Sequence, residues 1–474
     1  MNTESRVYFS KGKLVILWLI FSLWLLGAYP FLFQLLFSYE AFQSADGRLM
    51  PLFELAFILL GGVLCLRNRA DMAVAGSFVL LAFVSTVIVN ERPLSDWING
   101  IRFYVPLLFM LPIIRYAMAT EARRDYFMEL MDRSLYLFLW LQGPCMIYQL
   151  ITMGGWDYGG GSLGVFQSGI ISELIYMISF YLMIRRWDMS KGYFTNIARN
   201  WILVFLLYPS FLNETKSSFL FMLMYFVFLM PLNRRTLKTL AIMIPVTAVA
   251  MWAFIYVYNS LYGNKVQSRD TFSLEYLDWY VLGDAADLEM MELAYEATDF
   301  DEEVDFQRGL KMAAVPWIME DQKRDGVWIF GNGVGILKGH SEDDPSDLGG
   351  EYKWLFQGTA MTLQMLVLEC GALGVVWLIA AMIVLFHRPA SMPKKRNRNR
   401  QMYGFLVSML VAVLFYNTSM NIIIFGIIYY YMSFLCSRWS YTDNLGNITP
   451  GAPMLQLGGI FTKVRYPRVN TDKQ

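Results

Sequence analysis

Four basic residues and one histidine stand out because they fall in polar stretches of an otherwise apolar chain. The basic residues are Arg102, Lys216, Arg269 and Arg308, and the histidine is His340, one of only two in the sequence. Cations gathered in one place would bind a diphosphate, because arginine pairs bidentately with phosphate oxygens. An imidazole beside them could serve as a general base near neutral pH. These side chains predict a cationic cleft for a phosphorylated substrate.

Carboxylates also fall inside apolar segments, where an ionised group needs a partner. Glu369 lies about ten residues into a long apolar segment, and Glu173 and Glu54 lie in two others. Ionisable residues at membrane depth are functional candidates because they are costly to bury. The candidate catalytic residues are Arg308, His340 and Glu369, and the candidate diphosphate-binding residues are Arg102, Lys216, Arg269 and Arg308. The alternatives are snorkelling or salt-bridged cations and an ordinary loop histidine.

The elements that must position these residues are membrane helices. The chain has 474 residues, of which 56% are hydrophobic and only 16% charged, below the roughly 25% of soluble proteins. Several apolar runs exceed the roughly 18 residues of a membrane span. All four cysteines lie in apolar segments without a CxxC pair, so neither a zinc site nor a disulfide framework is expected. We predict an all-α polytopic membrane protein that uses no metal or other cofactor.

Hydropathy predicts about twelve spans, and the basic residues orient them. The spans are expected at 14–37, 50–66, 72–90, 103–120, 134–152, 169–184, 200–212, 217–231, 237–258, 359–386, 402–416 and 420–436. With the N-terminus inside, 27 Lys and Arg residues lie inside and four in the short outer loops. Since cytoplasmic loops carry the excess of basic residues, both termini are expected in the cytosol. Two of these spans, 200–212 and 217–231, are short, which predicts a hairpin around an outward-opening cavity near Lys216.

The predicted spans divide the chain into four parts. Nine spans fill 1–258, one large extracytosolic loop covers 259–358, three spans fill 359–437, and 438–474 form a cytosolic tail. The loop holds 21 Asp and Glu against 8 Lys and Arg. Apolar residues from Phe306 to Trp317 recur at helical spacing, which predicts an amphipathic helix broken near Pro316.

Three stretches resemble those of the O-antigen polymerase and O-antigen ligase superfamily of bacterial envelope glycosyltransferases. The first is the turn Thr215–Leu220. The second begins at Arg308 and ends in the glycine run Gly331–Gly335. The third is Glu369–Gly374, which is similar to the superfamily's Glu-x-Gly-x-x-Gly entry into the next span. Their order and topological placement also match this superfamily, over nearly the whole chain.

The resemblance implies an enzyme of the bacterial inner membrane that uses polyprenyl-diphosphate-linked oligosaccharides as donor and acceptor. An acceptor hydroxyl would attack the anomeric carbon with inversion and expel polyprenyl diphosphate, held by arginines without a metal. Ligase-type members often carry a His-Asn pair just before the Glu-x-Gly-x-x-Gly span, where this chain has Ala360-Met361. This departure favours a repeat-unit polymerase of a surface polysaccharide such as lipopolysaccharide.

Two other functions remain as alternatives to the polymerase. A ligase would transfer finished glycan to a lipid or protein acceptor through the same cleft. A twelve-span transporter is less favoured, because one outer loop dominates and no two related halves are found. The expected partners are the lipid bilayer, the lipid-linked glycan and a chain-length regulator, and no nucleic acid.

Overall fold

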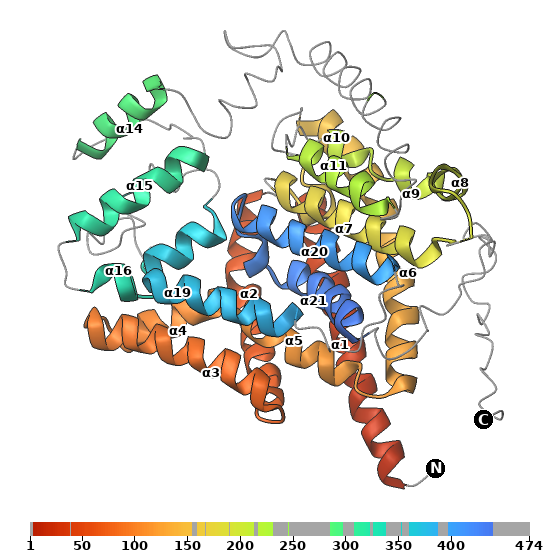
Figure 1. Ribbon diagram of the computed structural model, residues 1–474, viewed down its shortest axis with the longest axis horizontal. Coiled ribbons are helices and arrows are strands. Elements are labelled where there is room, and N and C mark those ends of the chain that lie inside the picture. Colours follow the sequence, from red (N-terminus) through yellow and green to blue (C-terminus); the bar gives the residue numbers. More distant parts are fainter. Residues whose placement is uncertain are drawn as a thin grey trace.

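The computed structural model of the protein is mainly helical in the residues that it describes. These are 3–37, 39–153, 159–165, 167–188, 190–212, 217–230, 245, 285–296, 308–322, 326–337, 352, 360–386 and 397–438. No strand occurs among them. Figure 1 shows a bundle of long helices, with shorter helices of the predicted outer loop at one side.

The first half of the chain forms helices that follow the predicted apolar segments. They are α1 (Thr3–Leu36), α2 (Tyr39–Cys65), α3 (Arg69–Phe83), the π-helix η1 (Val84–Val89), α4 (Leu94–Phe103), α5 (Val105–Ala117), α6 (Glu121–Met153), the short 3-10 turn η2 (Gly161–Leu163) and α7 (Ser168–Arg186). Shorter helices then follow, α8 (Tyr193–Arg199), α9 (Trp201–Phe205), α10 (Pro209–Leu212) and α11 (Ser218–Leu229).

The second half supplies the loop helices and the last part of the bundle. The predicted loop contains α14 (Ala285–Glu296), α15 (Arg308–Asp321) and α16 (Val327–Phe330). The C-terminal helices are α19 (Thr362–Phe386), α20 (Asn397–Leu414), the 3-10 turn η3 (Ser419–Asn421) and α21 (Ile423–Arg438).

Five of the described helical segments are long and apolar enough to cross a membrane, and the bent pair α4 and α5 would make a sixth. Five shorter apolar helices accompany them, including 201–212 and 220–229. The protein is therefore a helical multi-pass membrane protein. Twelve spans and their orientation remain a prediction, and the expected span 237–258 lies outside the described residues except for residue 245.

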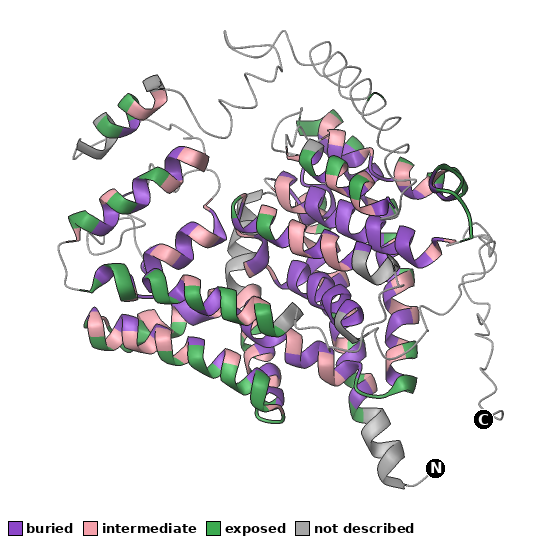
Figure 2. Ribbon diagram, in the orientation of Figure 1, coloured by how far each residue is buried: buried purple, intermediate pink, exposed green. Residues whose placement is uncertain are grey.

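Helix α7 forms the centre of the bundle. Of the 18-residue apolar window of this helix, 94% is buried, and Figure 2 shows it surrounded by other buried helices. Phe180 of α7 stacks on Phe405 of α20 with ring centroids 3.9 Å apart. Near the C-terminal end of α7, buried Arg185 pairs with Asp132 of α6 at 2.7 Å. A helix that is apolar on all sides is expected at the core of a bundle.

Two membrane-depth segments are bent or broken. Helices α4 and α5 meet at a bend of 57°, with Tyr104 between them. The expected span 103–120 began at this bend and left out α4, which carries Asp96, Asn99 and Arg102. In α19 the helix is interrupted at Gly371, which has φ 62° and ψ −156°. Sequence hydropathy could not show this break, because apolar residues continue on both sides. Non-helical backbone at membrane depth requires partners within the protein.

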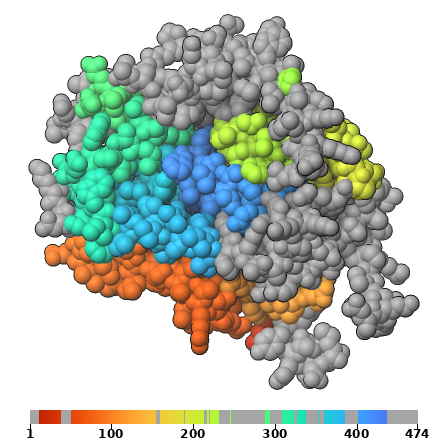
Figure 3. Space-filling view, viewed as in Figure 1, coloured from red at the N-terminus to blue at the C-terminus, as the bar shows by residue number. Residues whose placement is uncertain are grey.

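The amphipathic helix predicted in the loop is α15, with one difference. It continues through Pro316 to Asp321, although a break was expected at this proline. Pro316 lies on the exposed side, so the hydrogen bond that proline cannot form is lost where water can replace it. The opposite side, with Leu310, Ala314 and Ile318, is buried. Figure 3 shows this part of the loop packed beside the bundle.

Candidate functional site

The candidate site is centred on Arg308, the first residue of α15. Its Nε donates a hydrogen bond to the carbonyl oxygen of Tyr416 at 2.8 Å. Its guanidinium carbon lies 4.2 Å from the centroid of the Tyr416 ring. The ring and the carbonyl together fix the plane of the guanidinium, and a cation over an aromatic face is stabilised by about 0.5–2 kcal/mol. Arg308 itself is partly exposed, so its charge can be approached from outside the bundle.

Tyr416 is held in place by its neighbour Asn417, whose polar groups join three elements. The side-chain amide of Asn417 donates to Glu173 Oε1 of α7 at 2.7 Å. Its backbone carbonyl accepts from the backbone N–H of Thr362 at 2.9 Å and from the Thr362 hydroxyl at 3.0 Å. Its side-chain oxygen accepts from the N–H of Ser419 at 2.9 Å. We call Tyr416, Asn417 and Glu173 the arginine seat.

Glu173 anchors the arginine seat in the interior of the bundle. It has no exposed surface, and its Oε1 accepts the hydrogen bond from the Asn417 amide. The electrostatic effect of Arg308 on Glu173 is small beside that of burial. The seat therefore links the start of α15 to an acidic side chain of the central helix through Tyr416 and Asn417.

Other polar atoms near the seat lack partners among the described residues. Gln364 of α19 donates its amide to the Lys311 carbonyl, one turn after Arg308, at 2.9 Å. Its side-chain oxygen is buried without a donor there. The Ser217 hydroxyl, just before α11, is likewise buried without a partner in the described part. Phe221 of α11 lies edge-on to the Tyr416 ring, with centroids 6.2 Å apart. Buried unpaired polar groups are few in proteins, and a bound ligand or water is one explanation for them.

A second polar cluster joins the glycine run Gly331–Gly335 to the break in α19. Because Gly371 leaves the helical conformation, the carbonyls of Leu368 and Glu369 point to other partners. The Leu368 carbonyl accepts from the N–H of Asn332 at 2.8 Å, and the Glu369 carbonyl accepts from the N–H of Gly333 at 3.0 Å. The glycine run thus supplies the hydrogen bonds that the broken helix lost.

The π-helix η1 closes the same cluster from a third side. The Ser85 hydroxyl donates to the carbonyl of Phe330 at 2.5 Å. The Thr86 hydroxyl accepts from the N–H of Val334 at 2.9 Å, and the Asn90 amide donates to the carbonyl of Gly331 at 3.0 Å. We call the glycine run, η1 and the α19 break the glycine clasp. It fixes the predicted outer loop to two separate parts of the bundle.

Glu369 lies at the centre of the glycine clasp and is 2% exposed. Its Oε2 accepts a hydrogen bond from the Tyr104 hydroxyl at 2.6 Å, and its Oε1 accepts one from the N–H of Gly335 at 2.9 Å. Tyr104 lies at the bend between α4 and α5. The carboxylate therefore ties two broken helices and the glycine run together, which is a positioning role. Its predicted catalytic role stays a prediction.

Of the other predicted site residues, the structure describes only Arg102. It forms an ion pair with Glu54 of α2, with Nη2 2.7 Å from Oε2, and the Arg102 side chain is 31% exposed. Lys216, Arg269 and His340 lie outside the described residues. The structure does bring together two of the stretches that looked informative in the sequence, since Gly331–Gly335 and Glu369 are in direct contact.

Sequence reasoning missed the residues that hold Arg308 and Glu369. Tyr416 and Asn417 fall in the short connection between two apolar segments, and the polar run Asn417-Thr418-Ser419 was the only signal there. Tyr104 sits beside Arg102 at the start of an apolar segment. Ser85 and Thr86 lie inside another, where polar residues can mark a broken helix.

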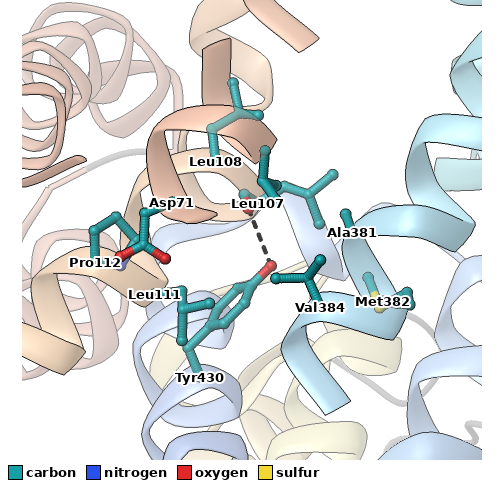
Figure 4. A pocket seen from close by; sticks show the side chains of 10 residues that line it. Asp71, Leu107, Leu108, Leu111, Pro112, Ala381, Met382, Val384 and Tyr430 are labelled. Carbon is teal, nitrogen blue, oxygen red and sulfur yellow. Dashed lines mark hydrogen bonds between the residues drawn. The ribbon is translucent and has the colours of Figure 1, made fainter. Parts of the chain in front are cut away.

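A small cavity lies elsewhere in the bundle, between α3, α5, α19 and α21. Its volume is about 20 Å³, and it is lined mainly by aliphatic side chains (Figure 4). Tyr430 donates to the carbonyl of Leu107 there at 3.1 Å, and Asp71 at its edge pairs with Arg115 at 2.7 Å. A cavity of this size holds about one water molecule. It is too small for a sugar or a diphosphate.

Comparison with known proteins does not assign the chain to a family. The chain matches no protein-family model, and no curated protein is significantly similar to it.

Proposed function

We propose that the protein is a glycosyltransferase that polymerises oligosaccharide repeat units carried on polyprenyl diphosphate. The observation that carries this proposal is Arg308, whose partly exposed guanidinium is held by the ring and the carbonyl of Tyr416 where the loop helix α15 meets the bundle. A diphosphate leaving group develops negative charge as its bond to the sugar breaks. A cation already fixed in place stabilises that charge without reorganisation.

The proposed reaction is an inverting substitution at the anomeric carbon. A hydroxyl oxygen of the acceptor glycan forms the new bond, and the bond between the anomeric carbon and the diphosphate oxygen breaks. The bonding electrons leave with polyprenyl diphosphate, which Arg308 holds. The hydroxyl proton passes to a base, for which His340 is the candidate from the sequence. Buried polar atoms of Gln364 and Ser217 offer hydrogen-bonding groups for sugar hydroxyls beside the cation.

The proposal includes a topology. Twelve spans with both termini in the cytosol would place α15 and the glycine clasp on the outer face of the bacterial inner membrane. Lipid-linked substrates would then reach Arg308 from the bilayer. Cysteine labelling from either side of the membrane at α15 tests this arrangement.

The size distribution of surface and lipid-linked glycans in a strain lacking the protein tests the proposed activity. We expect single repeat units on the final anchor or on the carrier lipid, because chain extension would stop. Full-length polymer stranded on the carrier would instead identify a ligase. An unchanged profile would contradict both and favour the transporter alternative.

A second prediction concerns the arginine seat. Asn417→Asp replaces the amide that donates to Glu173 with a carboxylate, so two buried anions would face each other. The seat should shift, and misplacement of a catalytic group by about 1 Å can cost roughly 10²-fold in rate. The double variant Glu173→Gln with Asn417→Asp restores one amide and one carboxylate in exchanged positions. We expect it to regain most of the chain extension lost in the single variant, as measured by glycan length at equal protein abundance.

Comparing the double variant with the single variants distinguishes a loss of Arg308 positioning from a loss of folding. Glu173→Gln alone keeps a hydrogen-bonded amide pair and should lose less than Asn417→Asp. Equal losses in Asn417→Asp and in the double variant would show that the amide–carboxylate contact does not position Arg308.

A further inference from the structure

Among the residues that the structure describes, a buried arginine at the opposite end of the bundle has no carboxylate partner. Arg123, in the first turn of α6, is 5% exposed. Its Nε donates to the Thr120 hydroxyl at 3.2 Å. The guanidinium packs against Gly12 of α1 and lies 5.0 Å from the centroid of the Tyr116 ring. Its Nη1 has no hydrogen-bond partner among the described residues. A buried charge without a compensating group is costly.

Two further cations lie beside it. The Arg67 guanidinium, just after α2, is 5.2 Å from the centroid of the same Tyr116 ring. Lys13, next to Gly12, lies 5.0 Å from the centroid of the Tyr126 ring. We call Lys13, Arg67 and Arg123 the cation cluster. It brings the ends of α2, α5 and α6 together beside Gly12 and Lys13 of α1.

Nearby carboxylates are engaged with other basic residues. Asp71 pairs with Arg115 at 2.7 Å. Glu121 and Asp125 lie 3.5 and 3.7 Å from Arg124. Within the described part of the chain, none of the three clustered cations has a carboxylate within ion-pair distance.

The partial charges at the nearby helix ends do not neutralise the positive charge of the cation cluster. The carbonyl ends of α2 and α5 offset part of the charge, but Arg123 lies at the N-terminus of the 33-residue helix α6. That end carries positive partial charge, although Thr120 accepts hydrogen bonds from the N–H groups of Arg123 and Arg124, and the positive end of a helix favours an anion. The cluster therefore has the composition of an anion-binding site.

The surface next to the cluster indicates what kind of anion it takes. On α1, Leu14, Leu17 and Phe21 are 70%, 46% and 52% exposed. They form a helical stripe that begins beside Lys13. On α2, Leu59, Val63 and Leu66 are 63%, 59% and 73% exposed, and this stripe ends beside Arg67. The two helices are neighbours, since Trp18 stacks on Phe53 with ring centroids 5.4 Å apart.

We propose that the cation cluster binds the phosphate of an anionic phospholipid whose acyl chains lie along these two apolar stripes. A basic pocket between helices with adjoining apolar surface suits a lipid headgroup. Free phosphate has no acyl chains, so the apolar stripes would not increase its affinity. The charge bias of the chain predicts that this is the cytosolic leaflet. The proposal is independent of the reaction proposed at Arg308.

The test uses the full-length protein purified in a neutral detergent. The midpoint of thermal unfolding is measured against increasing phosphatidylglycerol, phosphatidylcholine or inorganic phosphate. We expect only phosphatidylglycerol to raise the midpoint in a saturable way, because a ligand that binds the native state stabilises it. Arg67→Gln should weaken the apparent affinity for phosphatidylglycerol roughly fivefold, which corresponds to the contribution of about 1 kcal/mol from each basic residue near an anionic lipid surface.

Arg124→Gln is the matched control. It removes the same charge one residue along α6, where the arginine already has two carboxylates beside it, so affinity should match that of the native protein. Arg67 is exposed and its loss leaves the buried packing intact, so this variant folds even where Arg123→Gln does not. Equal affinity in Arg67→Gln and the native protein, or the same stabilisation by inorganic phosphate, would overturn the proposal.

Discussion

Arg308→Ala should abolish glycan chain extension while the protein still accumulates in the membrane. The substitution removes the guanidinium that would stabilise the departing diphosphate. Loss of one fixed group at a developing charge typically lowers turnover by about 10²–10³. Arg308 is partly exposed at the start of α15, so its removal should leave the packing of Leu310 and Ala314 unchanged. The readout is glycan length on gels, normalised to protein abundance by immunoblot.

Two further variants sharpen this result. Arg308→Lys keeps the charge but loses the planar fork that pairs bidentately with phosphate oxygens, so it should retain a small part of the activity. Arg133→Ala is the control, because this arginine lies on exposed α6 surface and pairs with Glu129 at 2.6 Å. It should give native chain lengths. Native lengths in Arg308→Ala would remove the central support for the proposed function.

Gly331→Ala and Gly371→Ala should each strongly destabilise the folded protein. Both glycines have positive φ, 73° and 62°, where a Cβ costs about 1–2 kcal/mol. A Cβ on Gly371 would lie 2.6 Å from the carbonyl carbon of Ile329 and 2.7 Å from the N of Gly331. A Cβ on Gly331 would overlap the backbone of Glu369 and Cys370. Overpacking adds about 1–3 kcal/mol, so we expect a total loss of about 2–5 kcal/mol.

The measurement is thermal unfolding of purified variants, together with the amount of folded protein in the membrane. Gly76→Ala in α3 is the control, since nothing lies within 4 Å of the added Cβ. An exposed helical glycine gains up to about 1 kcal/mol from this change, so its midpoint should stay or rise. Native midpoints for Gly331→Ala and Gly371→Ala would show that the glycine clasp tolerates side chains.

The sequence predicted where helices run better than where they break. Apolar length placed α1, α6 and α7 well, because burial in a membrane bundle depends mainly on hydropathy. The interruption at Gly371 and the bend at Tyr104 depend on partners in η1 and the glycine run, which are remote in sequence. At Pro316 the opposite occurred. A break was expected at this proline, but α15 continues through it because Pro316 lies on the exposed side of the helix.

The candidate site residues could be predicted from the sequence, but their contacts could not. Glu369 could be found because charged residues are rare in apolar segments and need partners, and Arg308 because basic residues are few in the acidic predicted loop. The identity of those partners could not be read from spacing. Arg308 and the carbonyl that it contacts are 108 residues apart, and Glu369 and Tyr104 are 265 residues apart. Arg102 illustrates the alternative, because its ion pair with Glu54 is compatible with a purely structural role.

The glycine clasp also constrains the order in which the protein can be made. Ser85 and the Phe330 carbonyl that it contacts are 245 residues apart. At about 5–20 residues per second, translation takes roughly 12–50 s to cover that distance. During this interval Ser85, Thr86 and Asn90 have left the ribosome without their final hydrogen-bond partners. Helices α3 to α5 must therefore remain without these contacts until residues 326–337 and the broken helix α19 have been synthesised.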